Sequence, residues 1–125
     1  MREVSILIPT YNGREILEEC LPSVAAEVER RGRIDEVIII DNAGGDGTGE
    51  FIKNNYPWMR ILRLNENKAI FAINDGAEAA GKELLFFLND DMILKPGCID
   101  ALTAVFDSDD VFAATGKVYT WDRVS

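Results

Sequence analysis

The chain opens with Val4-Ser5-Ile6-Leu7-Ile8-Pro9-Thr10-Tyr11-Asn12-Gly13, a strand-like run that passes directly into a polar turn. Its first five residues are nearly all apolar and β-branched, as in strands buried on both faces of a parallel sheet. Residues 37–40 and 84–88 have the same character. Residues 60–64 are interrupted by charges, which predicts a less buried strand at an edge of the sheet.

Helical patterns separate these runs. Residues 15–30 repeat apolar side chains every 3.6 positions, in a helix that Pro22 is expected to kink or split. Thr48 is placed to cap a short helix. Residues 70–80 carry another helical stripe, which begins at Ile70 and predicts that this side chain is buried.

The alternation of strands and helices predicts the fold class. A last helix is expected to begin near Pro96, and residues 111–118 favour a fifth strand. This order is typical of an α/β fold, here a three-layer sandwich with a mainly parallel central sheet. At 125 residues the chain has room for one domain, residues 1–125.

Composition narrows the functional classes. Thirteen Lys and Arg against 22 Asp and Glu give a net charge of −9, which argues against nucleic acid or an anionic membrane as the main partner. The sequence has no His, so chemistry based on His is excluded within it, and Cys20 and Cys98 are too few for a disulfide framework. With no membrane-length apolar run and no signal-peptide pattern, we expect a cytoplasmic location.

Polar residues follow every predicted strand. The segments are Pro9 to Gly13, Asp41-Asn42 with a glycine-rich turn, Asn65 to Lys68, and Asn89-Asp90-Asp91. Because ligands of open parallel sheets bind at the carboxyl ends of the strands, Asp41, Asp90 and Asp91 are expected to converge on one crevice. Turns are polar for backbone reasons as well, so a single such turn would mean little.

The pair Asp90-Asp91 suggests a divalent cation. Two adjacent carboxylates after a buried strand repel each other and lose hydration, and a cation with oxygen ligands relieves that cost. Neither familiar phosphate-binding glycine loop is present. The glycines of residues 44–49 are instead expected to form a tight turn that leaves Asp41 exposed.

These segments resemble the inverting family 2 glycosyltransferases of the GT-A fold. The opening run, the segment from Asp41 to Thr48, and Asn89-Asp90-Asp91 resemble three motifs of that family in order. The last is similar to its D-x-D-type metal motif in the N-D-D form of rhamnosyltransferase-like members. The resemblance covers essentially the whole chain.

The resemblance implies a donor and a metal. The donor would be a UDP-, dTDP- or GDP-sugar, the metal Mn²⁺ or Mg²⁺, and the acceptor a glycan or a lipid-linked sugar. Pro9, Thr10 and Tyr11 would line the base and ribose, although Tyr11 is equally suited to cover the crevice. Asp41 would accept from the base ring N–H, Asp90 would contact the ribose or donor sugar, and Asp91 would hold the metal. The remaining candidate binding residues are Asn12, Asn42, Asn67 and Lys68.

Two departures from the family pattern limit the assignment. The run from Asn67 to Asn74 lacks the glycine that the family often has after the third strand, so the floor of the donor site is expected to differ. Lys68 would compensate by meeting phosphate, or is simply an exposed lysine. The family's general base lies in a later segment, so we expect the base outside this chain, which would be the donor-binding half and inactive alone.

A second reading is a non-catalytic nucleotide-sugar-binding module that acts with a partner domain. A nucleotidyltransferase would need a Gly- and Arg-rich loop after the first strand, and a phosphoacceptor receiver domain would need its acidic pair there; residues 9–12 supply neither. Membrane contact, at the inner face, is expected only through segments outside these residues.

Overall fold

The computed structural model describes residues 2–107, 113, 114 and 116. Its longest helix, α1, has 17 residues. No helix within this described part is long and apolar enough to cross a membrane. The elements, in chain order, are β1 (Val4–Thr10), α1 (Arg14–Arg30), β2 (Glu36–Asp41), α2 (Thr48–Asn55), β3 (Arg60–Arg63), the 3-10 turn η1 (Ala69–Phe71), α3 (Ala72–Ala79), β4 (Leu84–Phe87), α4 (Cys98–Ala104) and the 3-10 turn η2 (Val105–Asp107).

The described strands form one parallel sheet in the order β3-β2-β1-β4. The register pairs Thr10 with Asp41 and Asp41 with Arg63 across the first three strands, so their carboxyl ends lie level. On the other side of β1, Leu7 pairs with Phe87. The predicted parallel α/β sheet is therefore confirmed, and β3 lies at an edge as its charges indicated.

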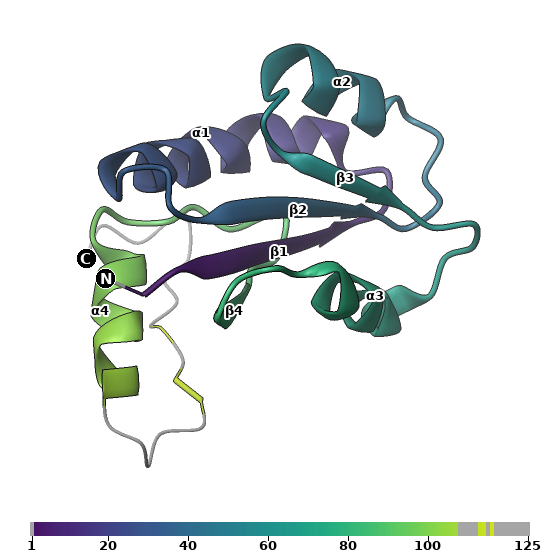
Figure 1. Cartoon of the computed structure of the whole chain (residues 1–125). Helices are drawn as coiled ribbons and strands as arrows, with labels where there is room; N and C mark the ends of the chain where they lie inside the picture. The colour runs from purple at the N-terminus through teal and green to yellow at the C-terminus, as the bar shows by residue number, and fades with distance from the viewer. Residues whose placement is uncertain (1, 108–112, 115, 117–125) are drawn as a thin grey trace.

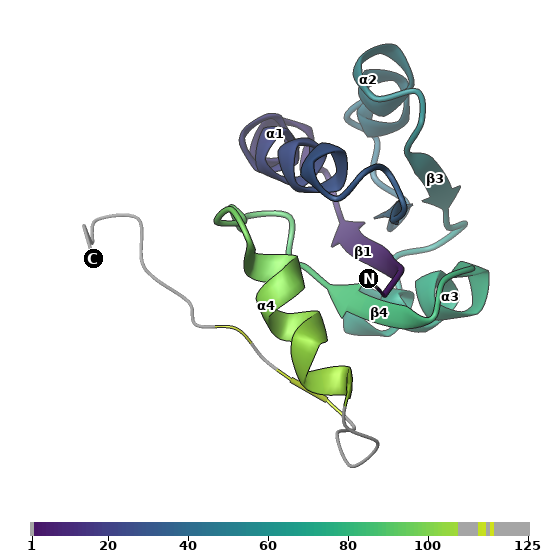
Figure 2. The same cartoon turned by 60° about the vertical axis from the view of Figure 1, so that its left-hand side comes forward.

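Helices cover the sheet on both faces, which confirms the three-layer sandwich (Figure 1). Strand alternation sends Ile6, Ile8 and Ile39 into a core with α1, α2 and α4, while Leu7 and Ile40 face α3 in a smaller core. Figure 2 shows α4 beside α1 on the same side of the sheet.

Helix α3 lies close against the sheet because Gly76 faces it. A Cβ atom at Gly76 would overlap the side chain of Ile40, which is fully buried. Ala72, one turn earlier, is also fully buried. The predicted stripe is wrong at its start, because Ile70 lies in η1 and is 78% exposed; the small residues, not the large ones, face the strands.

Strand β4 differs from its prediction. Its wholly apolar run predicted burial on both faces, yet Leu85 and Phe87 are 42% and 57% exposed. Two causes account for this: β4 is an edge strand of the described sheet, and α3 packs on β1 and β2. Leu84 and Phe86, on the opposite face, pack against the larger core.

The structure also tests the local predictions for Pro22 and Thr48. Pro22 does not split α1, which runs through it with the ring on the exposed side. Thr48 is the first residue of α2 rather than its cap; the Asp46 carboxylate accepts from its amide at 3.2 Å and from its hydroxyl at 2.5 Å. The expected strand at 111–118 lies largely outside the described residues.

A buried ion pair ties the amino edge of the sheet to the helices. The Arg31 guanidinium donates to Asp35 at 2.6 Å, and both side chains are fully buried. Arg31 also donates to the Arg2 carbonyl at 2.6 Å and to Asp100 of α4. Asp35 accepts from the Val4 amide at 2.9 Å. One guanidinium therefore joins α1, β1 and α4.

The α1–α4 contact makes stability depend on pH. The pKa of Glu27 and the pKa of Asp100 are both lowered, chiefly by hydrogen bonds from the Arg30 side chain. Such carboxylates stabilise the fold above their unfolded pKa, and the stabilisation is lost as pH falls through the lowered folded values. We expect urea unfolding midpoints to be level near neutral pH and to fall below a pH of about 4.5.

Asp100→Asn should reduce this acid dependence. It removes charged hydrogen bonds from a half-buried carboxylate, so the free energy of unfolding at neutral pH should drop by about 1 kcal/mol. Glu29→Gln, which alters only an exposed pair with Arg33, is the matched control and should leave the profile unchanged. An Asp100→Asn profile with the wild-type slope would contradict the assignment.

Candidate functional site

The ends of β1, β2 and β4 meet at the carboxyl edge of the sheet. The Thr10 hydroxyl donates to Asp90 Oδ2 at 2.9 Å, so the end of β1 is joined to the turn after β4. On the other side, Asp41 is the register partner of Thr10, and the Asn42 amide donates to the Thr10 carbonyl at 2.9 Å. Thr10 thus lies between the two predicted carboxylates.

Asp90 and Asp91 differ in environment. Burial raises the pKa of Asp90, the charge of Asp91 raises it further, and the hydrogen bond from Thr10 opposes both effects. Asp90 is half-buried, whereas Asp91 is exposed in the turn. A cation near the pair would favour the charged form of Asp90, which burial disfavours.

Two glycines make this close arrangement fit. A Cβ at Gly13 would overlap Thr10 Oγ1 and lie 2.5 Å from Asp90 Oδ2. A Cβ at Gly44 would lie 2.8 Å from both the backbone nitrogen and Oδ1 of Asn12. Sequence reasoning placed Gly13 and Gly44 in turns but did not assign them to the site, because the lack of space is visible only in three dimensions.

The loops after β1 and β2 are joined by side-chain hydrogen bonds. Asn12 has a positive φ of 50° and its Oδ1 accepts from the Gly45 amide at 2.7 Å. Asp46 accepts from the Arg14 amide at 2.9 Å. Pro9 is half-buried, and Tyr11 is 54% exposed at this edge.

Asp41 is covered rather than exposed, which makes the expectation of an exposed Asp41 wrong. Its Oδ1 accepts from the Gly44 amide at 3.0 Å and its Oδ2 from Arg63 Nη1 at 2.6 Å. The Asp41 side chain is 3% exposed and that of Arg63 is 58% exposed. Sequence reasoning missed Arg63; the signal was a cation at the last position of an edge strand, next to the strand that ends in Asp41.

The remaining predicted residues organise the loop before α3. The Asn42 side chain accepts from the Lys68 amide at 2.7 Å and donates to the Ala69 carbonyl at 3.0 Å. Asn67 Oδ1 accepts from the Ala69 amide at 2.8 Å. Lys68 Nζ lies 3.2 Å from Asp75. These contacts fix the loop, whose Ala69 has a positive φ of 51°.

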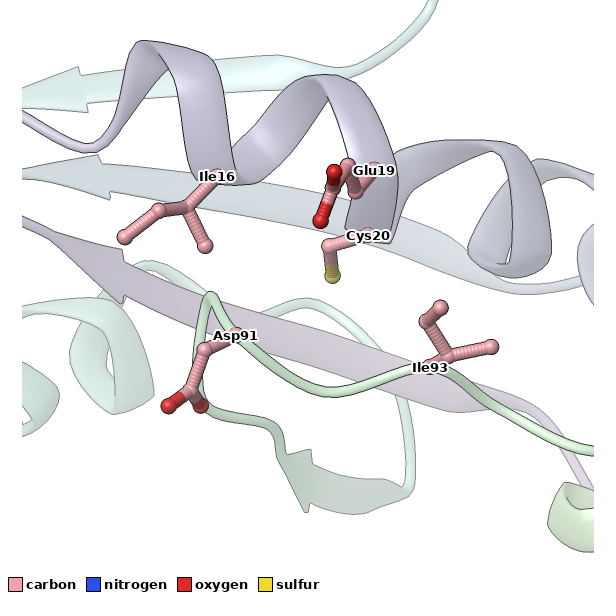
Figure 3. A pocket seen from close by; sticks show the side chains of 5 residues that line it. All are labelled: Ile16, Glu19, Cys20, Asp91 and Ile93. Atoms are coloured by element: carbon pink, nitrogen blue, oxygen red, sulfur yellow. The ribbon is translucent and has the colours of Figure 1, made fainter. Parts of the chain in front are cut away.

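A cavity of about 150 Å³ borders Asp91, lined also by Ile16, Glu19, Cys20 and Ile93 (Figure 3). Figure 3 shows the Asp91 carboxylate turned away from Glu19 and Cys20, so these groups do not converge. Burial, with the charges of Asp90 and Asp91, raises the pKa of Cys20 to about 12, which keeps its thiol protonated. No cluster of three metal-ligating side chains occurs within the described part of the chain.

The donor set at this edge fits a metal of one kind. An exposed carboxylate with free coordination space suits Mg²⁺ or Mn²⁺ held by one or two protein carboxylates, with water and phosphate completing the shell. A single exposed carboxylate does not suit a cation that is enclosed by protein ligands. Asp91 is an exposed carboxylate of the kind that suits Mg²⁺ or Mn²⁺.

A larger cavity, about 560 Å³, lies at the opposite, amino edge of the sheet between α1 and α2. Tyr56 and Trp58 line it together with Glu29 and Arg33, which pair with each other. Its other carboxylate, Asp35, is already paired with Arg31. Its charged groups are therefore paired, unlike the acidic pair at the carboxyl edge.

Comparison with known sequences identifies a family. The family model described as "Glycosyl transferase family 2" matches residues 5–124. The chain is 33% identical over 92 residues to "Glycosyltransferase AglE" of Haloferax volcanii, a match that covers 70% of this chain and 30% of AglE. The chain thus spans about a third of the length of this relative.

Comparison with solved structures supports the fold. S. aureus TarS in complex with UDP-GlcNAc superposes with a TM-score of 0.68 at 22% identity, over 84% of this chain and 31% of that one. The mannosyltransferase PcManGT from Pyrobaculum calidifontis, in complex with GDP-Man and Mn²⁺, superposes with a TM-score of 0.61 at 24% identity. The match covers 72% of this chain and 28% of PcManGT. The α/β architecture is the GT-A-like fold of these neighbours.

Thr10→Val tests the contact at the centre of the site. The change keeps the side-chain shape but removes the hydroxyl that lowers the pKa of Asp90, so this pKa should rise further above its ordinary value. Carboxyl carbon NMR across an acid titration measures it. Thr103→Val, whose hydroxyl bonds a carbonyl within α4, should leave Asp90 unchanged. An equal or lower Asp90 pKa in Thr10→Val would argue against the contact.

Proposed function

The chain belongs to glycosyl transferase family 2, and from this premise we propose that it binds a nucleotide-diphospho-sugar at the carboxyl edge of its sheet. The observation that carries the proposal is the placement of Asp41, covered, and Asp90, half-buried, on either side of Thr10, with Asp91 exposed in the turn next to Asp90. TarS with UDP-GlcNAc and PcManGT with GDP-Man, which share the fold, support the same class of donor.

Each side chain has a proposed role that follows from its position. Asp41 accepts a hydrogen bond from a base ring N–H, because a carboxylate has about four lone-pair sites and the Gly44 amide and Arg63 occupy two of them. Tyr11, which is exposed at the same edge, stacks on the base or covers the crevice. Pro9 and Thr10 line the base and ribose, and Asp90 contacts the ribose or the donor sugar.

Asn12, Asn42 and Asn67 act by holding loops, since their amides already bond backbone groups. They shape the walls of the donor site. Lys68 is engaged with Asp75, and it reaches a phosphate only by leaving that carboxylate. The missing family glycine after β3 is consistent with a floor built by these contacts.

Asp91 is the residue that would hold Mn²⁺ or Mg²⁺. A chain with a net charge of −9 and no phosphate-binding glycine loop repels a diphosphate, so a cation between them is the expected solution. When bound, the metal supplies positive charge that stabilises the departing nucleoside diphosphate. PcManGT, which shares the fold and is in complex with Mn²⁺, supports the proposal of a divalent metal.

For the protein that carries this chain we propose inverting transfer of the sugar to a hydroxyl of a glycan or lipid-linked acceptor. In the family, the general base lies in a segment after the metal motif, and we assign it to none of the described residues. The alternative is a binding module without transfer. It predicts nucleotide-sugar binding with no nucleoside diphosphate released in the presence of acceptors.

Binding of UDP, GDP or dTDP should depend on metal. We expect one of them to raise the melting temperature only with Mn²⁺ or Mg²⁺ present, by a stabilisation of about 2.7 kcal/mol at about 100 times Kd. Asp91→Asn should abolish the difference between metal and EDTA, because it removes the metal-holding carboxylate.

Glu19→Gln is the matched control for this experiment. It removes another carboxylate that lines the same cavity but projects from α1, and it should retain the metal dependence. Equal stabilisation of the wild-type chain by nucleotide in EDTA would show that the metal assignment is wrong. Stabilisation by no nucleoside diphosphate, with or without metal, would refute the donor proposal itself.

A further inference from the structure

We propose that Arg63 is a base-selecting residue of the donor site, an inference that rests on the proposed function. In the free chain its guanidinium covers the Asp41 carboxylate. On binding, it moves aside to donate to the carbonyl oxygen that flanks the ring N–H of uracil, thymine or guanine. Asp41 accepts from that N–H.

The position of Arg63 follows from the sheet register. Asp41 ends β2, Arg63 ends β3, and the two residues are direct partners across the parallel pair. Arg63 Nη1 lies 2.6 Å from Asp41 Oδ2. The Leu64 amide donates to the Asp41 carbonyl at 2.9 Å, so the pairing of the two strands continues one residue further.

The two partners differ in freedom. Asp41 is held by the Gly44 amide as well as by Arg63, and its side chain is 3% exposed. Arg63 lies on an edge strand with 58% of its side chain exposed. A ligand that approaches Asp41 therefore meets the guanidinium first, and the arginine is the partner that can move. A guanidinium carries five N–H donors, so Arg63 can face a ligand with others than the one that Asp41 accepts.

Side by side, a carboxylate and a guanidinium present an acceptor next to a donor. Uracil, thymine and guanine present the complementary edge, a ring N–H next to a carbonyl oxygen. Cytosine and adenine present a ring nitrogen acceptor next to an amino group, so a base held with its ring nitrogen toward Asp41 would leave both Asp41 and Arg63 facing like groups. Pairing of the amino group with Asp41 would require the base to shift along the edge. Such a shift is disfavoured where the base position is fixed, and without it the buried Asp41 carboxylate would face an acceptor.

A purely structural Arg63 would behave differently. If Arg63 only neutralised Asp41, its removal would lower the stability of the free chain and would weaken the binding of every nucleotide by the same factor. A base-selecting Arg63 changes the ratio between bases. The ratio therefore separates the two roles.

The experiment measures the Kd of the chain for UDP, GDP, dTDP, CDP and ADP by calorimetry with Mg²⁺ present. The wild-type chain should bind at least one of UDP, GDP and dTDP about tenfold more tightly than CDP or ADP. Arg63→Met should weaken the binding of that favoured nucleotide about tenfold and bring its Kd close to the Kd of CDP. Arg63→Lys keeps a positive charge beside Asp41 but lacks the planar guanidinium. Compared with Arg63→Met, it should recover more of the stability of the free chain than of the preference between bases.

Arg33→Met is the matched control. It removes another exposed guanidinium from an ion pair, at the amino edge of the sheet, and should leave all Kd values unchanged. A wild-type preference that survives intact in a folded Arg63→Met chain overturns the inference while the proposed function stands. Binding of no nucleoside diphosphate by the wild-type chain overturns both.

Discussion

A single hydrogen bond, from the Thr10 hydroxyl to the Asp90 carboxylate at 2.9 Å, joins the last residue of β1 to the turn after β4. Because β1 is central and also pairs with β2, this bond places Asp90 on one side of Thr10 and Asp41 on the other. Gly13 leaves room for it, since any Cβ there would overlap both partners. The geometry of the whole edge follows from this contact together with the register of β1.

The three carboxylates at the carboxyl edge of the sheet lie in three different environments. Asp41 is neutralised by Arg63 at 2.6 Å. Asp90 accepts from Thr10, and burial raises its pKa. Asp91 is exposed to solvent. In the proposed site, a donor with a nucleobase, a sugar and a diphosphate would present an N–H, hydroxyls and a metal-bound anion in turn, and each carboxylate would meet one of these groups. The proposed binding order along the edge is thus the order of these three environments.

Much of the fold was predictable because buried parallel strands leave a plain signal: β1 and β2 are long apolar runs followed by polar turns. Position within the sheet was less accessible, since residues 84–88 read as fully buried while Leu85 and Phe87 of β4 are exposed at an edge. The stripe of α3 failed at Ile70 because a close helix selects small residues such as Gly76.

At the site, sequence placed Asp41, Asp90 and Asp91 after strands, and the structure brings the first two around Thr10. The roles of three other residues could not be predicted, because they depend on neighbours distant in sequence. Arg63 is set by its register partner Asp41, and Gly13 and Gly44 are required by nearby atoms that leave no room for a Cβ. Periodicity reports which face a residue occupies along its own element. It carries no information about which residue of another strand will lie opposite.

The most direct test of the central claim is an amide NMR map of the chain with UDP, GDP or dTDP added together with Mg²⁺. The account predicts that the shifted amides lie at the carboxyl edge, in residues 10–13, 41–45 and 89–91, and that those around Trp58 stay in place. Shifts confined to the Tyr56 and Trp58 cavity at the amino edge, with the carboxyl edge unchanged, would contradict it.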